Sequence, residues 1–330
     1  MRFVVVGCGS IGERHISNLK LLYPNNDIFV TDASAERLSF IARKYNVEAC
    51  NTFEEGLKKQ VDATFVCTPP SSHVALALQA VKNNSHVFIE KPLSNSANGI
   101  DLLIKKARIS NLSIFVGYCF RFHPGLEIAK RLLTTGELGK VLLIEAEYGQ
   151  YLPDWHPGQN YKQSYTAKKE LGGGIILDGS HEIDYTRWLV GPIEKVFCFA
   201  SQPETSLEVE TESVACILLK FANGCIGTLH LDFVRKDYSR SCKIICEKGT
   251  IDWSFQNDSL KVYRKDINHW TKYDNLLPDV NKIYQREIEN FVLSIEREEP
   301  PFIGAEEGLK TLQVALAALE SSEKGEVIEI

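Results

Sequence analysis

The chain has 330 residues, of which 44% are hydrophobic and 24% are charged, ordinary values for a globular protein with room for two domains. Its formal net charge is −6 and its Lys and Arg residues are scattered among acids, which argues against a nucleic-acid-binding surface. No apolar run approaches the length of about 18 residues that a membrane span needs, so we expect no association with a membrane.

Short apolar runs alternate with amphipathic segments in the first third of the chain. The runs are Phe3–Val6, Ile28–Val30, Ala63–Cys67, Val87–Ile89 and Ile114–Val116, and the amphipathic segments are 11–22, 34–44, 72–83 and 96–109. Continuous apolar runs are typical of parallel strands covered on both faces, and the segments between them predict the covering helices. We therefore predict a doubly wound, Rossmann-type parallel sheet over residues 1–120. An α/β barrel would share the alternation, but the pattern stops near residue 135. The first run is too short for a signal peptide, which favours a cytoplasmic location.

A different pattern fills the rest of the chain, residues 121–330, which we predict to be a second domain for substrate binding and oligomerisation. Strands are predicted at 139–150, 194–202, 210–221, 225–235, 241–247 and 250–254. An irregular segment is predicted at 151–174, and helices at 175–190, 281–297 and 305–322. Asn223-Gly224 is typical of a hairpin turn, so the strands predict an antiparallel sheet with one covered face.

The first predicted strand runs into Gly7-Cys8-Gly9-Ser10-Ile11-Gly12, which matches G-x-G-x-x-G and opens the first predicted helix. Gly7 permits a tight turn, Gly9 lets backbone approach a pyrophosphate, and Gly12 lets the helix pack closely on the sheet. Free N–H groups at the amino end of the helix favour anions, so Ser10 and Ile11 belong to the same predicted phosphate site. The motif predicts a bound dinucleotide.

The second predicted strand leads to Asp32, about 20 residues after Gly12, where an acid binds the adenosine ribose hydroxyls. A carboxylate repels a 2′-phosphate, so Asp32 favours NAD over NADP. Arg37 lies nearby in the sequence and could accommodate a 2′-phosphate, which leaves NADP open as the second cofactor.

Two later strand ends add residues to the predicted cofactor site. Thr68 and Pro69 follow one strand, and Glu90-Lys91-Pro92 follows the next. Ligands bind at the carboxyl ends of parallel strands, so we predict cofactor contacts from these residues and from His73. We expect Lys91 to point into the cleft beside the nicotinamide.

The segment Gly172-Gly173-Gly174 precedes Asp178, His181 and Asp184 in the second domain. The three glycines let the backbone pass close to another chain segment or a ligand. Asp178 and His181 are three residues apart and so share one face of the predicted helix, and Asp184 extends the row. An acid, an imidazole and a lysine suit proton transfer to or from a hydroxyl.

The irregular segment carries aromatic and polar groups of the kind that hold sugars. Aromatic faces stack on the C–H surfaces of a pyranose, and Asp or His side chains bind its hydroxyls. Arg121, just before this segment, could bind a carboxylate or phosphate. The predicted substrate contacts are Arg121, Tyr151, Asp154, Trp155, His156, Tyr165 and Asp184.

Taken in order and spacing, these motifs resemble the Gfo/Idh/MocA oxidoreductases, named for glucose-fructose oxidoreductase and inositol dehydrogenase. The matching marks are the glycine turn with His15, Thr68-Pro69-Pro70 with His73, Glu90-Lys91-Pro92, and the glycine triplet with Asp178, His181 and Asp184. The resemblance covers essentially the whole chain. It implies a Rossmann domain, an α/β domain with an open, mostly antiparallel sheet, a homo-dimer or homo-tetramer, and Lys91 as the catalytic lysine.

One spacing departs from the common family pattern. Family members commonly place the acid four residues before the histidine, whereas here Asp178 precedes His181 by three. The chain resembles a subgroup with Ser-His-Glu-Ile-Asp-Tyr, associated with surface-polysaccharide or unusual-sugar synthesis, that shares the shorter spacing. His181 therefore aligns as the acid/base, while Asp178 either orients it or binds substrate.

The leading hypothesis is an NAD-dependent oxidoreductase that reversibly oxidises a secondary hydroxyl of a sugar, sugar nucleotide or cyclitol. Lys91 and His181 form its acid/base pair, and His181 could also bind substrate while Lys91 does the chemistry. Two alternatives stay open: a dinucleotide-binding sensor without turnover, and a sugar elimination or hydrolysis in which NAD is regenerated. The nine cysteines include no C-x-x-C pair, and we predict no metal site.

Overall fold

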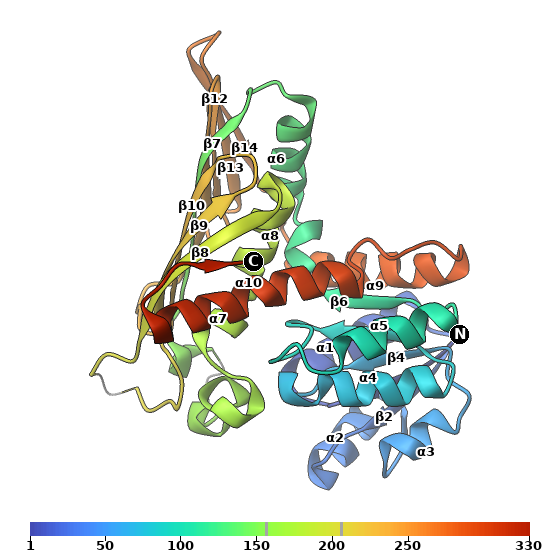
Figure 1. Cartoon of the computed structure of the whole chain (residues 1–330). Coiled ribbons are helices and arrows are strands. Elements are labelled where there is room, and N and C mark those ends of the chain that lie inside the picture. The colour runs from blue at the N-terminus through green and yellow to red at the C-terminus, as the bar shows by residue number, and fades with distance from the viewer. Residues whose placement is uncertain (156–157, 205–206) are drawn as a thin grey trace. The chain divides into compact units, whose positions relative to one another are not determined.

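The computed structural model describes residues 1–155, 158–204 and 207–330, and the chain divides into two compact units (Figure 1). Unit 1 comprises Met1–Cys119 and Asn281–Lys310, and unit 2 comprises Phe120–Val280 and Thr311–Ile330. The first boundary lies close to residue 120, where the sequence divides into two predicted domains. The return of 281–310 to unit 1 is a difference from that division, which placed all of 121–330 in the second domain.

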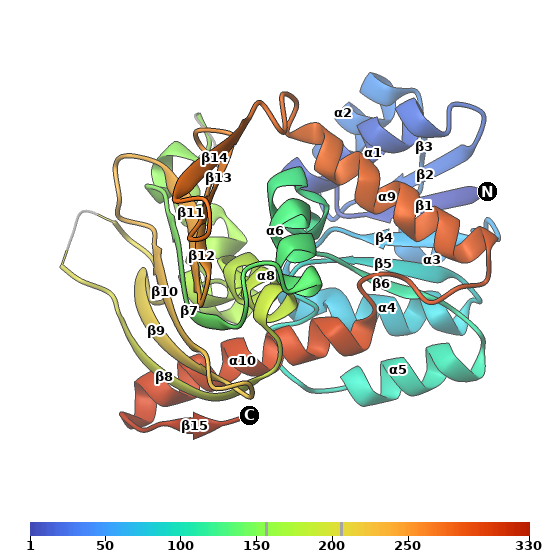
Figure 2. The ribbon, with the colours of Figure 1, turned by 90° about the horizontal axis from the view of Figure 1, so that it is seen from above.

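Unit 1 is built on a six-stranded parallel sheet in the order β3-β2-β1-β4-β5-β6. The strands are β1 (Arg2–Val6), β2 (Asp27–Thr31), β3 (Glu48–Ala49), β4 (Ala63–Val66), β5 (His86–Glu90) and β6 (Ile114–Gly117). The helices are α1 (Ser10–Leu22), α2 (Ala35–Tyr45), α3 (Phe53–Leu57), α4 (His73–Lys82), α5 (Ile100–Ile109) and α9 (Asn281–Glu296). Helices α1 and α9 cover one face of the sheet and α4 and α5 the other, which confirms the doubly wound fold (Figure 2).

The core of unit 1 explains why α9 belongs to it. The rings of Phe65, Phe88 and Phe115, from three neighbouring strands, stack with centroids 4.9 and 5.1 Å apart. Phe291 of α9 lies against all three, with centroid separations of 5.7 to 6.0 Å. Such aromatic contacts bury large apolar areas, so α9 completes, beside α1, the cover of one face of the sheet.

Unit 2 is built on a nine-stranded sheet in the order β14-β13-β12-β11-β7-β10-β9-β8-β15. Its strands are β7 (Val141–Gly149), β8 (Ile193–Ser201), β9 (Val214–Phe221), β10 (Ile226–Asp232), β11 (Ser239–Cys246), β12 (Gly249–Ser254), β13 (Ser259–Arg264), β14 (His269–Asp274) and β15 (Ile328–Glu329). Among the described strands β7 and β10 pair in parallel, and the other neighbours are antiparallel. The mostly antiparallel sheet is therefore confirmed.

The helices of unit 2 pack on one face of this sheet. The residues of β9 accordingly alternate between buried and exposed, because one face of the sheet is covered and the other is not. They are α6 (Pro124–Thr135), α7 (Ile175–Asp178), α8 (Ser180–Val190) and the later part of α10 (Ala305–Lys324). The segment predicted as one helix at 175–190 is two, because Gly179 separates α7 from α8. Within its described residues, the irregular segment forms short 3-10 turns at Leu152–Asp154, Tyr161–Gln163, Tyr165–Ala167 and Lys169–Leu171.

None of the helices in the described part of the chain combines the length and apolar character that crossing a membrane requires.

Candidate functional site

The glycine turn in unit 1 has the steric features that its three glycines were expected to provide. A Cβ on Gly7, whose φ is +91°, would lie 2.6 Å from the Cys67 carbonyl oxygen, and a Cβ on Gly12 would lie 1.9 Å from the Gly7 oxygen. A Cβ on Gly9 would meet no described atom within 4 Å. Gly7 and Gly12 are therefore required by the turn itself, whereas Gly9 faces open space that a ligand can enter.

The amino end of α1 is prepared for an anion. Gly9 is the residue before the helix, and no described side chain caps this end. Ser10 is exposed and Ile11 is half-buried. The free N–H groups of the first turn and the helix dipole both favour a phosphate there, so these residues fit a dinucleotide pyrophosphate.

Asp32 is held in place by the backbone. Its Oδ2 accepts a hydrogen bond from Cys8 N at 2.6 Å, and its Oδ1 accepts one from Ser34 N at 2.8 Å. Each carboxylate oxygen keeps further lone-pair capacity for ribose hydroxyls. The half-buried carboxylate therefore fits the role predicted for it.

Arg37 is engaged within unit 1. Its Nε donates to the Cys8 carbonyl at 2.6 Å, and its guanidinium forms an ion pair with Glu13. Glu13 also accepts from Lys44 and Tyr45, and although burial opposes this, the hydrogen bonds from Lys44, Arg37 and Tyr45 lower its pKa. The Arg37 charge is thus balanced by an ionised partner.

The strand ends at β4 and β5 are joined through His73. Both of its ring nitrogens lie against backbone carbonyl oxygens, Nδ1 at 2.9 Å from Pro92 and Nε2 at 2.8 Å from Thr68. His73 is fully buried, so in this structure it links the Thr68 turn to the Lys91-Pro92 segment. Thr68 and Pro69 are half-buried beside it, and the Thr68 hydroxyl lies 2.7 Å from that of Ser72.

Lys91 follows β5 directly and is half-buried. Glu90, predicted as a cofactor contact, is buried and turned toward the protein: its Oε1 lies 2.6 Å from His15 Nε2, and its Oε2 accepts from Lys91 N at 3.1 Å. Glu287 of α9 is also buried, and it forms a cluster with His15 and Glu90. No local pattern around Glu287 indicates a place in this cluster, because the division of the sequence at residue 120 assigns its helix to the second domain.

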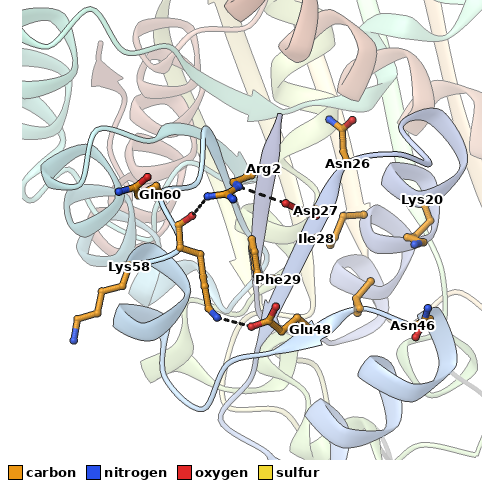
Figure 3. A pocket seen from close by; sticks show the side chains of 12 residues that line it. Arg2, Lys20, Asn26, Asp27, Ile28, Phe29, Asn46, Glu48, Lys58 and Gln60 are labelled. Atoms are coloured by element: carbon orange, nitrogen blue, oxygen red, sulfur yellow. Dashed lines mark hydrogen bonds and ion pairs between the residues drawn. The ribbon is translucent and has the colours of Figure 1, made fainter.

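A separate depression of about 520 Å³ in unit 1 is lined by residues at the amino ends of β1 and β2, including Arg2 and Asp27 (Figure 3). Arg2 forms an ion pair with Asp27 at 3.4 Å and donates to the Lys59 carbonyl at 2.8 Å. Ligands of doubly wound sheets bind at the carboxyl ends of the strands, so this depression is not the dinucleotide site.

In unit 2 the glycine triplet packs against the irregular segment, as expected. A Cβ on Gly173 would lie 2.4 Å from the carbonyl oxygens of Tyr165 and Thr166. A Cβ on Gly174, whose φ is +109°, would lie 2.4 Å from Glu212 Oε1. Burial raises the pKa of the Glu212 carboxyl, which accepts from Ile176 N at 3.0 Å at the start of α7.

Asp178 is tied to the irregular segment. It accepts hydrogen bonds from the Tyr165 hydroxyl at 3.1 Å and the Thr166 hydroxyl at 3.0 Å, and it is 6% exposed. Asp178 thereby links α7 to the loop that carries Tyr165.

His181 lies in the first turn of α8 and is 8% exposed. The Phe120 ring meets its imidazole edge to face, with centroids 4.9 Å apart. Arg240 lies over the faces of Phe120 and Tyr148, at 4.5 and 3.9 Å from the ring centroids. The His181 imidazole thus packs against the Phe120 ring, which the Arg240 guanidinium also contacts.

Two buried ion pairs hold this part of unit 2. Arg121 and Asp184, both predicted as substrate contacts, pair with each other through two hydrogen bonds of 2.8 and 2.7 Å at 3% and 1% exposure. Asp184 also accepts from Thr311 at 3.1 Å. Arg240 pairs with Glu182 at 2.8 Å. Arg240 and Glu182 lie far apart in the chain, so no local pattern in the sequence indicates their pairing.

The residues of the predicted sugar-binding loop differ in how far they are packed into the protein. Trp155 donates its indole N–H to the Gln150 carbonyl at 3.2 Å and packs on Phe233, so it belongs to the core of the loop. Tyr151 and Tyr165 are half-buried, and Asp154 is exposed. His156 lies outside the described residues.

Comparison with known families agrees with both units. The family model described as an oxidoreductase family with an NAD-binding Rossmann fold matches residues 1–118, and the model of the Gfo/Idh/MocA C-terminal domain matches residues 126–252. The chain belongs to the Gfo/Idh/MocA family. This Gfo/Idh/MocA protein is accordingly an NAD-dependent oxidoreductase.

Relatives of this Gfo/Idh/MocA protein span its whole length. It is 26% identical to a myo-inositol 2-dehydrogenase of Thermotoga maritima, over 100% of this chain and 98% of the relative. A solved levoglucosan dehydrogenase in complex with NADH and levoglucosan has a TM-score of 0.89 at 18% identity, covering 100% of this chain and 99% of that one. A UDP-N-acetylglucosamine 3-dehydrogenase of Acidithiobacillus ferrooxidans has a TM-score of 0.82 at 24% identity, covering 98% of both chains. At identities of 18% and 24%, the similarity to these two solved structures shows the fold of this chain alone.

Proposed function

We propose that this protein uses NAD to oxidise reversibly a secondary hydroxyl of a sugar, a sugar nucleotide or a cyclitol. The observation that carries the proposal is Lys91, which directly follows β5 in the same parallel sheet whose strands lead to the glycine turn and Asp32. A lysine at that edge is suited to act on a substrate held beside the nicotinamide. Bound NAD supplies a hydride acceptor for the carbon that bears the hydroxyl.

The protein's own groups handle the proton and the charge. His181 takes the hydroxyl proton, and the Lys91 ammonium stabilises the alkoxide that develops on the substrate oxygen. In reverse, His181 returns the proton. Asp178 positions the Tyr165 loop through its two hydroxyl donors, and the Phe120 ring restricts the orientation of His181.

The proposed cofactor preference is NAD over NADP. Asp32 offers a carboxylate to the ribose, and the ion pair of Arg37 with Glu13 offsets the charge that a 2′-phosphate would need. Gly9, Ser10, Ile11 and Gly12 would hold the pyrophosphate, and Thr68 and Pro69 would border the nicotinamide half.

The relatives and the loop chemistry support a polyhydroxylated substrate. The names of the relatives describe dehydrogenases of inositol, of levoglucosan and of a UDP-linked amino sugar. Tyr151, Tyr165 and Asp154 supply a half-buried aromatic surface and an exposed carboxylate, which suit C–H faces and hydroxyls respectively. Arg121 and Asp184, each satisfied by the other, act as scaffold for these groups.

Activity is tested by following NADH formation with myo-inositol, levoglucosan and UDP-N-acetylglucosamine as substrates. With the best of these, Lys91→Ala should lower kcat by about 10²–10⁴-fold, the usual contribution of a positioned acid–base group, while the Kd for NADH stays within about twofold. Lys272→Ala, a change at a side chain that is 56% exposed on β14, is the matched control and should leave kcat unchanged.

Three results would contradict this function. Near wild-type kcat in Lys91→Ala would remove the lysine from the mechanism. Consumption of a sugar without net NADH accumulation would indicate an elimination or hydrolysis in which NAD is regenerated, and tight NADH binding without turnover of any polyol would indicate a sensor.

A further inference from the structure

Three buried titratable groups meet beneath Lys91 in unit 1. His15 comes from α1, Glu90 from the end of β5, and Glu287 from α9, and their exposures are 0%, 6% and 0%. One nitrogen or oxygen atom from each lies within 4.8 Å of the others. The cluster lies against aromatic rings, since those of Phe65 and Phe88 have their centroids 5.6 and 5.0 Å from that of the imidazole.

The two carboxyl groups of this cluster differ in their hydrogen-bond donors. Glu90 has the His15 Nε2 at 2.6 Å from one oxygen and the Lys91 backbone N–H at 3.1 Å from the other. Neither oxygen of Glu287 has a partner within the described parts of the chain. A buried carboxylate is stable only when donors satisfy it, so Glu90 is the group equipped to hold the negative charge.

Glu287 is the group equipped to hold a proton. Burial raises its pKa well above the usual value, and the neighbouring Glu90 raises it further, while Arg14 opposes the shift. Two like charges at this separation in a dry site would repel strongly, and protonation of one acid relieves the repulsion. A neutral Glu287 also has an O–H group, which can donate a hydrogen bond within the cluster.

We propose that His15, Glu90 and Glu287 form a proton-sharing triad in which Glu287 is neutral, Glu90 carries the charge, and the ionised Glu90 positions Lys91 for catalysis. The triad joins the helix that receives the pyrophosphate to the strand end that carries Lys91, and α9 closes it from the third side. This inference rests on the proposed function, because it assigns Lys91 a catalytic role.

A metal ion is the other species that such a cluster could hold. The 2.6 Å separation of His15 Nε2 and Glu90 Oε1 is that of a direct, charge-assisted hydrogen bond, whereas two ligand atoms on a tetrahedral ion lie about 3.4 Å apart. A shared proton therefore accounts for the geometry better than a cation does. Among the described residues, Arg14 on α1 acts on Glu287, and the charges of the cluster act on Cys67 after β4, His73 on α4 and Tyr284 on α9.

The triad predicts opposite results for two chemically identical substitutions. Glu287→Gln replaces a neutral acid by a neutral amide of the same shape, so kcat should stay within about twofold of wild type. Glu90→Gln removes the charge that orients the Lys91 backbone, so kcat should fall by about 10–100-fold, while KM and the Kd for NADH stay within about twofold. A loss confined to kcat separates a positioning role from a general loss of structure.

The proton itself is measured independently of activity. Infrared difference spectra of the whole protein at pH 8 should show the carbonyl stretch of a protonated carboxylic acid, which Glu287→Gln removes. Its absence from the wild-type spectrum would overturn the triad, as would one equivalent of tightly bound metal found by elemental analysis. This measurement needs neither substrate nor an active enzyme, and it stands if Glu90→Gln does not fold.

The outcomes separate the triad from the proposed function. Equal losses of kcat in Glu90→Gln and Glu287→Gln would overturn the assignment of charge. An infrared band that depends on Glu287, together with full activity of Glu90→Gln, would overturn the positioning of Lys91. Full activity of Lys91→Ala would refute the proposed function while leaving the infrared result valid.

Discussion

The two units hold their polar groups in opposite ways. In unit 1 the groups offered to a ligand are anchored by backbone: Asp32 accepts two main-chain N–H groups, and the amino end of α1 is left without a side-chain cap among the described residues. In unit 2 the charged side chains around His181 form ion pairs with one another: Arg121 pairs with Asp184, and Arg240 pairs with Glu182. Unit 1 therefore presents a preformed ligand site, whereas unit 2 presents a rigid scaffold.

This difference has a physical cause. A dinucleotide offers the same phosphates and ribose to every protein that binds it, and main-chain N–H groups with glycines meet those needs regardless of the surrounding side chains. A substrate is recognised by side chains, and these must be held in one rotamer by a well-packed support. Buried bidentate ion pairs provide such support, because they are geometrically restrictive.

The largest expected effect on stability follows from breaking the scaffold of unit 2. Arg121→Ala leaves the Asp184 carboxylate at 1% exposure, with the Thr311 hydroxyl still donating to it, and the loss of a buried partner costs about 3–5 kcal/mol. Urea-induced unfolding measures the change in the free energy of unfolding.

A double variant and a surface pair serve as its controls. Arg121→Ala combined with Asp184→Ala should recover at least about half of the loss, because no buried charge is left without its partner. Arg264→Ala, which breaks the exposed pair with Glu137, should cost less than about 1 kcal/mol. Unchanged stability in Arg121→Ala, accompanied by a raised KM, would instead make Arg121 a direct substrate ligand.

The next effect tests whether the glycines of unit 1 serve the fold or the ligand. Gly12→Ala drives a Cβ to within 1.9 Å of the Gly7 oxygen, so we expect about 3 kcal/mol or more of destabilisation. Gly9→Ala adds a methyl group to open space, so its free energy of unfolding should change by less than about 1 kcal/mol.

The same pair is compared for NADH binding. Gly9→Ala should raise the Kd for NADH by about 100-fold or more, because the added methyl group occupies space that the pyrophosphate needs. The measurements are thermal unfolding and NADH fluorescence titration. Wild-type NADH affinity in Gly9→Ala would place the pyrophosphate elsewhere.

Most of unit 1 was predictable from the sequence because its determinants are local. Gly7, Gly9 and Gly12 act within one turn, and buried parallel strands are continuous apolar runs such as Phe3–Val6 and Val87–Ile89. The exception is α9: the contact of Phe291 with three strands bridges about 175 to 225 residues of chain, and a helical pattern gives no information about which sheet it covers.

Less of the candidate site in unit 2 was predictable. Arg121 and Asp184 are polar residues near a predicted site, and their sequence neighbours do not reveal that they face each other across 63 positions. The break at Gly179 was missed because Ile175–Val190 keeps one apolar pattern through it. The strands β13 and β14 were missed; β14 is largely exposed, and so its sequence is polar.

The smallest expected effect comes from an ion pair of unit 2 that is not fully buried. His230 Nε2 lies 3.0 Å from Asp232 Oδ2, and the His230 side chain is 42% exposed. The hydrogen bond to Asp232 raises the pKa of His230 to about 9, although partial burial opposes the shift. If buried and exposed pairs differ as the comparison of Arg121 with Arg264 predicts, this pair should contribute about 1 kcal/mol or less.

The pH dependence of that contribution has a definite sign. A histidine whose pKa rises on folding stabilises the protein fully below its unfolded pKa, near 6.5, and the stabilisation is lost as the pH rises through about 9. His230→Gln should therefore lower the free energy of unfolding at pH 6 by up to about 1 kcal/mol and change it little at pH 9.5 or above. Urea unfolding of both proteins at several pH values between these limits measures the difference. A difference that stays constant, or that grows with pH, would mean that the imidazole is neutral in the folded protein and that Asp232 relies on the backbone N–H groups of Val234 and Arg235 and on the Arg235 guanidinium.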